Sequence, residues 1–167
     1  MAGSLIKKVI VAVNGSVSSE KAAMYAVMFC CQVKASLKVV NVVDTATINQ
    51  LLLAQILIPE EREKYTGNLR TEGENTLRHI KELAASKGLN IETEMREGAV
   101  WSELVACAGE YKADLIVVGA HRHYETTIGG TRHKDYLSAI NHEILNNADC
   151  NIIVVKDDDA DIKFRNF

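Results

Sequence analysis

The chain has 167 residues, a formal net charge of -3 and a composition that is 47% hydrophobic and 25% charged, with one proline. The length suits a single domain, and the composition excludes the collagen-like, low-complexity and disordered classes. The small negative charge gives no overall attraction for nucleic acid or anionic lipid, so no nucleic acid is expected as a partner.

Short apolar runs alternate with helical patterns in the first half of the chain. Residues 7–14 and 37–43 are rich in β-branched side chains and predict two strands that are covered on both faces. Between them, apolar residues recur at helical spacing from Ser18 or Ser19 onward, and a serine is a suitable N-cap for that helix. A second, long amphipathic helix is predicted from Pro59 to Lys87.

The run Leu51–Ile58 is apolar but lies in a connection where the alternation of strands and helices does not require it. Core packing is the default interpretation. A short helix over the end of the sheet and a surface for a partner are the two alternatives.

The second half repeats the alternation. Residues 90–97 alternate between apolar and polar side chains, which predicts a half-exposed edge strand. The remaining predicted elements are a helix at 101–111, a strand at 113–119, a polar loop at 120–134, a helix at about 135–147 and a strand at 151–156.

This order of elements predicts an α/β fold: a doubly wound, five-stranded parallel sheet with strand order 3-2-1-4-5 and helices on both faces. Residues 1–156 form the predicted domain, and residues 157–167 are expected to be a polar, solvated C-terminal tail. The apolar run Val9–Val13 is too short for a secretion signal, and no run approaches the length that spans a bilayer. We therefore expect a cytoplasmic protein without membrane insertion.

A sheet of this kind binds ligands beyond the carboxyl ends of its strands, where the strand order reverses. Here that point lies between the first and fourth strands, which Asn14-Gly15-Ser16 and Gly119-Ala120-His121-Arg122 follow. Gly15 permits a tight turn, and the serines after it precede the start of a helix. Two interpretations stay open, since these serines either cap the helix or help its N-terminus to accept an anion.

These segments resemble the universal stress protein family over about residues 5–156. The similarity lies in VIVAVNGSVSS, LKVVNVVD, the three residues REG before a helix, ADLIVVGAHR and ADCNIIVVK. The resemblance implies the doubly wound fold and a homodimer that pairs through the last strand, Asn151 to Val155. For one branch of the family it also implies ATP bound between the first and fourth strands.

The sequence departs from the pattern of that ATP-binding branch. The branch has an aspartate after the first strand and a G-x2-G-x9-G-S/T motif after the fourth. Here Asn14 replaces the aspartate, Arg122 replaces the second glycine, and Ser138-Ala139 stands at the final glycine and hydroxyl residue. Between Arg122 and Ser138 lie 15 residues where the motif has nine. Side chains at such positions block the approach of phosphate to the backbone, which predicts weak or absent ATP binding.

The main hypothesis is therefore a homodimeric stress-response regulator without substrate turnover. The alternative is an adenine-nucleotide sensor whose enlarged 120–134 loop rebuilds the phosphate site with Gly129-Gly130 and basic side chains. A third hypothesis, an adenylyl-transferring enzyme, lacks a convincing glycine loop after the first strand. ATP is the candidate ligand, with Mg only if ATP binds, and slow hydrolysis stays open. The candidate contacts are Val13, Asn14, Gly15, Ser16, Val43, Gly119, His121, Arg122, Gly129, Gly130, Ser138 and Ala139.

No catalytic or metal-binding residues are assigned. The chain has no recognisable serine, histidine and acid arrangement. Four histidines between His121 and His142 crowd together, but their spacing matches no zinc pattern. The four cysteines lack CxxC spacing and are interpreted as reduced packing residues.

Overall fold

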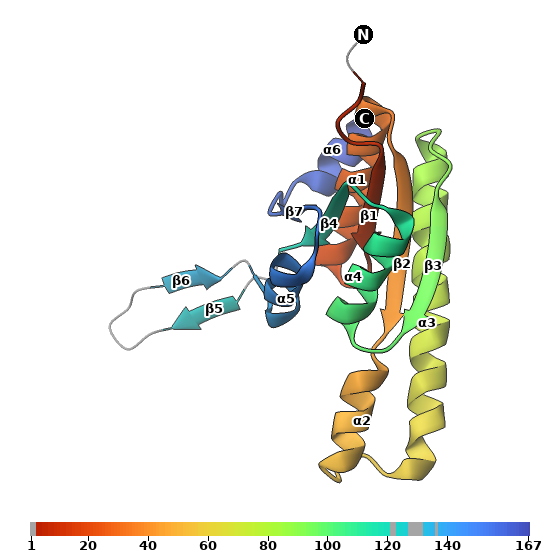
Figure 1. The fold of residues 1–167 in the computed structure, drawn as a ribbon, viewed down its shortest axis with the longest axis vertical. Coiled ribbons are helices and arrows are strands. Elements are labelled where there is room, and N and C mark those ends of the chain that lie inside the picture. Colours follow the sequence, from red (N-terminus) through yellow and green to blue (C-terminus); the bar gives the residue numbers. More distant parts are fainter. Residues whose placement is uncertain (1–2, 121–122, 127–131, 136) are drawn as a thin grey trace.

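A computed structural model describes residues 3–120, 123–126, 132–135 and 137–167. Five strands form one parallel sheet in the order β3-β2-β1-β4-β7, which confirms the predicted fold class and strand order (Figure 1). In the register, Val9 lies opposite Leu37 of one neighbouring strand and Leu115 of the other. The strands are β1 (Lys8–Ala12), β2 (Ser36–Val43), β3 (Glu92–Glu97), β4 (Leu115–Gly119) and β7 (Asn151–Val155).

Helices cover both faces of the sheet. One face packs against α1 (Val17–Val33), α3 (Pro59–Ser86) and α6 (Ala160–Asn166), and the other packs against α4 (Val100–Tyr111) and α5 (Ala139–Asn147). Val9 and Val11 of β1 belong to the core under α1, whereas Ile10 belongs to the core under α4. Because successive strand residues point to opposite faces, a strand covered on both faces needs a continuous apolar run.

The apolar connection after β2 forms α2 (Thr45–Leu53), which lies beside the first half of α3 and extends past the sheet (Figure 1). Within the run Leu51–Ile58, only Leu57 is buried, and the Leu53 side chain is 85% exposed. The default interpretation of this run as core is therefore wrong, because the two helices continue beyond the carboxyl ends of the strands they connect.

The C-terminal tail is not the solvated extension that its sequence suggested. It folds back along α1 as the short helix α6 and places Ala160 and Phe164 in the core. Two buried positions four residues apart are enough to anchor one turn of helix. They are too few to produce a periodic signal among so many charges.

The polar segment after β4 contains a two-stranded antiparallel sheet, β5 (His123–Thr126) with β6 (Arg132–Asp135), which stands clear of the main sheet in Figure 1. The predicted helix start near residue 135 is thus wrong, because α5 begins at Ala139. Neither short strand alternates apolar and polar residues, so the pattern gave no strand signal. In the described ranges, no helix has both the length and the apolar character needed to cross a bilayer.

Candidate functional site

A cavity of about 580 Å³ lies at the carboxyl ends of β1, β4 and β7. Its walls come from the first turns of α1 and α5, from α4 and from the segment that follows β7. Of the predicted contacts, Asn14, Ser16, Gly119 and Ser138 line this cavity. The cavity therefore lies at the point where the strand order reverses, which is where a ligand site was predicted.

The other predicted contacts do not line it. Val13, directly after β1, and Val43, at the end of β2, are buried, with 3% and 2% of their surfaces exposed. Gly15 and Ala139 adjoin lining residues in the sequence but are not part of the cavity wall. The remaining candidates, His121, Arg122, Gly129 and Gly130, lie outside the described residues.

The turn after β1 is closed by its own side chains. The Asn14 side-chain oxygen accepts a hydrogen bond from the Ser16 amide at 3.0 Å, and Gly15 takes a positive φ of 82°. The Ser16 hydroxyl accepts from the Ser19 amide at 3.2 Å and is the N-cap of α1. This confirms the capping interpretation for Ser16 and shows why a glycine stands between the two residues.

The end of β4 is hydrogen-bonded to side chains of two helices, α1 and α5. The Ser18 hydroxyl donates to the Ala120 carbonyl at 2.6 Å, and the Asn141 side-chain amide donates to the Gly119 carbonyl at 3.0 Å. The Ser138 hydroxyl accepts from the Asn141 amide at 3.1 Å and caps α5. These bonds fix the floor of the cavity, since the side-chain partners come from elements on opposite faces of the sheet.

A buried amide positions the end of β1. Asn41 of β2 is 6% exposed, and its side-chain nitrogen donates to the Val13 carbonyl at 2.9 Å. Gly73 of α3 packs directly over it, because a β carbon there would stand 2.4 Å from the Asn41 side-chain oxygen. The contact between Asn41 and Gly73 was not predicted from the sequence. Its only signals are one polar residue inside the apolar run of β2 and one glycine inside a long helix.

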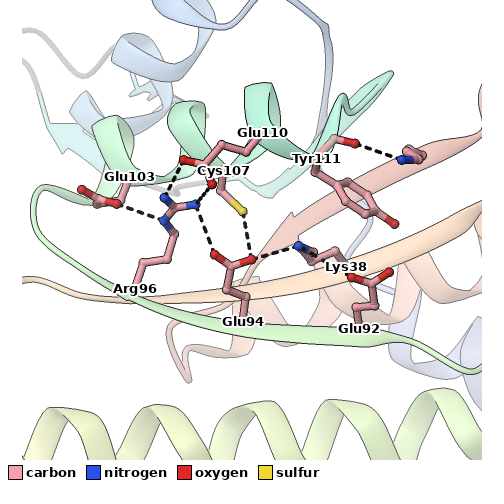
Figure 2. A network of polar contacts seen from close by, with 9 residues as sticks. Lys38, Glu92, Glu94, Arg96, Glu103, Cys107, Glu110 and Tyr111 are labelled. Atoms are coloured by element: carbon pink, nitrogen blue, oxygen red, sulfur yellow. Dashed lines mark hydrogen bonds and ion pairs between the residues drawn. The ribbon is translucent and has the colours of Figure 1, made fainter.

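A network of charged side chains ties α4 to the edge of the sheet (Figure 2). The Arg96 guanidinium of β3 binds both carboxylate oxygens of Glu110 at 3.0 Å and also pairs with Glu94 at 3.2 Å and Glu103 at 3.0 Å. The bidentate bond to Glu110 raises the pKa of Arg96 and lowers the pKa of Glu110. The prediction of a half-exposed edge strand is confirmed, since Glu92 and Glu97 of β3 are exposed while Arg96 is held against α4.

Lys38 of β2 extends the same network. Its ammonium pairs with Glu94 at 2.9 Å and lies 4.7 Å from the centre of the Tyr111 ring. The Cys107 thiol donates to Glu94 at 3.7 Å, and burial raises the pKa of that thiol. Because α4 contributes Leu104 to the cavity wall, the network acts on the site by holding this helix in place.

All four cysteines are unpaired, and Cys30 and Cys107 are buried, as expected of packing residues. Burial raises the pKa of Cys30 to about 12, so this thiol stays protonated and inert. Within the part of the chain that the structure describes, no three histidine, cysteine or acidic side chains are placed to hold a metal ion. His121 lies outside that part.

Comparison with known proteins places these features in a family context. The model of the universal stress protein family matches residues 5–156. The chain is 31% identical over 156 residues to universal stress protein MJ0531 of Methanocaldococcus jannaschii, covering 92% of this chain and 84% of that protein. It is 29% identical over 154 residues to universal stress protein YxiE of Bacillus subtilis, covering 91% of this chain and all of that protein.

Solved structures show the same fold. Universal stress protein UspA from Lactobacillus plantarum matches with a TM-score of 0.69 and 21% identity, covering 90% of this chain and 98% of that one. A universal stress protein solved in complex with cAMP matches with a TM-score of 0.61 and 26% identity, covering 91% of this chain and 98% of that one.

Proposed function

The chain belongs to the universal stress protein family, and on that premise we propose that it is a homodimeric stress-response regulator that binds ATP weakly or not at all. It acts by presenting a surface to a partner protein and not by turning over a substrate. Its cytoplasmic location remains a prediction.

The observation that carries the proposal is the position of Ser138. The ATP-binding branch of the family has a glycine there, whereas here a serine side chain lines the cavity and caps α5. Asn14 supports the same conclusion. It lacks the charge of the family's aspartate, and its side-chain oxygen already accepts the Ser16 amide. A triphosphate would have to displace both bonds to reach the backbone.

The exposed edge of the sheet supports the homodimer. Among the strands that the structure describes, β7 has a neighbour on one side only, so one row of its backbone groups is left without a partner strand. Its central residues, Ile152 to Val154, are only half-buried, whereas Leu115 to Val118 of the adjacent β4 are fully buried. A second copy of β7 would complete the sheet and cover these apolar side chains on both faces.

Sedimentation at micromolar protein concentration tests the dimer. Ile153→Lys is expected to shift the protein from dimer to monomer, because it places a charge in the proposed interface. Ile162→Lys is the control, since Ile162 lies on α6 and is already 47% exposed. A wild-type protein that sediments as a monomer would refute this part of the proposal.

An adenine-nucleotide sensor is the second candidate. The cavity of about 580 Å³ has the size of a small-molecule site. One relative, 26% identical to this chain, was solved in complex with cAMP. These observations favour a nucleoside or a nucleotide with a single phosphate as the alternative ligand.

Equilibrium titration with Mg-ATP and with cAMP separates the two candidates. The regulator hypothesis predicts no saturable Mg-ATP binding up to about 1 mM, which corresponds to a binding free energy weaker than about -4 kcal/mol. Micromolar affinity for Mg-ATP would establish the sensor. The variant Arg122→Gly then tests which feature of the chain weakens ATP binding. A gain in ATP affinity would identify the side chain at position 122 as the block, and no gain would assign the block to loop length or Asn14.

A further inference from the structure

The outer side of β7 limits how a second copy of the chain can extend the sheet. β7 is the last strand of the row in Figure 1, next to β4. Val155 lies opposite Gly119 of β4, and the Val155 carbonyl accepts from the Ala120 amide at 3.0 Å. Because the backbone groups of successive strand residues point alternately to the two sides, those of Ile152 and Val154 point away from β4. An antiparallel copy of β7 can therefore form hydrogen bonds with them.

Two-fold symmetry restricts the register of such a pair. Residues that stand opposite each other on two strands point to the same face of the sheet, whereas neighbours within one strand point to opposite faces. In a symmetric pair, a residue can therefore not stand opposite the copy of its own neighbour. One residue of β7 must then stand opposite its own copy, at the two-fold axis.

The burial pattern of β7 favours Ile153 at this position. The three central residues are apolar and half-buried, with an exposed asparagine before them and the buried Val155 after them. A centre at Ile153 pairs all five residues of the strand and covers the apolar ones on both copies. A centre at Ile152 or Val154 leaves one end of the strand unpaired.

This register brings the second copy to the candidate cavity. One step beyond the strand, the partner's Cys150 stands opposite Lys156, with the two β carbons about 5 Å apart. Both Val155 and Lys156 line the cavity. Cys150 is half-buried and packs with Ile152 against the core under α4, so its side chain belongs to the face of the sheet on which that helix lies.

We propose that the two β7 strands of the homodimer pair antiparallel about Ile153, so that the partner's Cys150 lies beside Lys156 at the wall of the cavity. The inference rests on the proposed homodimer, and it adds the register and the link between the dimer and the pocket. Each cavity then has a wall to which both copies contribute, and it is complete only in the dimer.

Oxidative cross-linking of the full-length chain tests the register, with the native Cys150 as a fixed probe. Three single variants each report one possible centre. Cys150 stands opposite position 154, 156 or 158 when the centre is Ile152, Ile153 or Val154, and the corresponding variants are Val154→Cys, Lys156→Cys and Asp158→Cys. Cysteines that stand opposite each other fall within the Cα separation of a disulfide, about 4.4–6.8 Å. Because burial raises the pKa of Cys150, oxidation is carried out at about pH 9.

The controls separate this bond from other disulfides. Lys156→Cys is also made together with Cys150→Ser, which removes only the probe. With Ile153 at the axis, the two copies of Cys150 are about 20 Å apart, and so are positions 150 and 156 within one extended chain. Wild type and the double variant should therefore form no covalent dimer. Sedimentation before oxidation verifies that each variant is a dimer.

We expect a covalent dimer on non-reducing gels for Lys156→Cys, and its loss in the double variant. A covalent dimer with Val154→Cys or Asp158→Cys, and none with Lys156→Cys, overturns the register and the contribution to the cavity. If all three variants sediment as dimers and none cross-links, the inference is refuted while the homodimer stands. A wild type that sediments as a monomer refutes the homodimer and the inference together.

Alkylation of Cys150, followed by mass spectrometry, gives a second measurement that needs no new cysteine. The thiol should react several-fold more slowly in the wild-type dimer than in Ile153→Lys, because the partner's strand covers it. Equal rates in the dimer and in the monomeric variant would contradict a partner at this position.

Discussion

The backbone of Gly119 lies directly against Ser18: a β carbon at position 119 would stand 2.5 Å from the Ser18 hydroxyl oxygen and 2.7 Å from its carbonyl oxygen. This approach joins the end of β4 to the first turn of α1, next to the hydrogen bond from Ser18 to the Ala120 carbonyl. The glycine that matches the first position of the family's ATP motif is thus also required for packing. Its presence alone is not evidence of phosphate binding.

Gly119→Ala tests that packing role. It is expected to lower the free energy of unfolding by about 1–3 kcal/mol, because neither the strand end nor the helix can move far without losing its hydrogen bonds. Adding Ser18→Ala should not restore stability, since the Ser18 carbonyl remains at 2.7 Å. Gly109→Ala is the control, because that position in α4 is open, and it is expected to gain up to about 1 kcal/mol. Urea denaturation measures all of these variants.

The network under α4 makes a second prediction. Arg96→Met leaves three glutamates close together without their shared cation, while the Arg96 side chain that it replaces is only 16% exposed. We expect a loss of about 1–3 kcal/mol in the free energy of unfolding, below the range for fully buried pairs because Glu110 is largely in solvent. Arg78→Met, on the exposed side of α3, should change stability by less than about 0.5 kcal/mol. Similar losses in both variants would contradict a specific role for the network.

Asp114 gives a prediction for pH. Its carboxylate accepts from the Lys7 and Lys8 amides at 2.8 and 2.9 Å, which lowers the pKa of Asp114 below its ordinary value of 3.8. A lowered folded pKa stabilises the protein above the ordinary value, and this contribution is lost as pH falls through the folded pKa. Asp114→Asn should therefore be less stable than wild type at pH 7, and the difference should shrink as the pH drops below 3.8.

Chemical denaturation at pH 7 and at progressively lower pH measures this difference. Asp149→Asn serves as the control, because Asp149 is exposed and no hydrogen bond to its side chain is seen in the described part of the chain. If the difference in free energy of unfolding between wild type and Asp114→Asn stays constant down to acid unfolding, the lowered pKa of Asp114 is contradicted.

Helix α6 makes a fourth prediction. Phe164→Ala is expected to lower the free energy of unfolding by about 3–5 kcal/mol, because the ring is 4% exposed and packs in the core with α1. Phe167→Ala removes the same side chain from a position that is 48% exposed and should cost less than about 0.5 kcal/mol. Equal effects in thermal or urea unfolding would mean that α6 is not part of the folded core.

The sequence predicted the central features of the fold because burial on both faces leaves a direct pattern. β1 and β4 contain continuous apolar runs, since each side chain of residues 9–11 and 115–118 enters one of the two cores. The pocket was located by topology, because the reversal of strand order leaves a crevice between β1 and β4 whatever the side chains are. That rule predicted Asn14 and Gly119 as residues of the pocket, because they lie at the ends of these two strands.

The missed features depend on partners that are distant in the sequence. The half-exposed edge strand β3 was predicted, but nothing in the local pattern shows that Arg96 meets Glu110 of α4. Asn41 looked like an interruption of β2, although it fixes the Val13 carbonyl at the edge of the site. Phe164 anchors α6 beside the cavity, but the charged residues around it in the tail leave no apolar pattern that predicts its burial. Pairings of this kind become visible only in three dimensions.

Native mass spectrometry of the protein, purified without added nucleotide, tests the proposed regulator, since one spectrum reports both the oligomeric state and any retained ligand. We expect the mass of a dimer with no triphosphate bound. A mass increment equal to one ATP in each protomer would contradict this expectation, because a pocket lined by the Ser138 side chain in place of a glycine should not retain that ligand through purification.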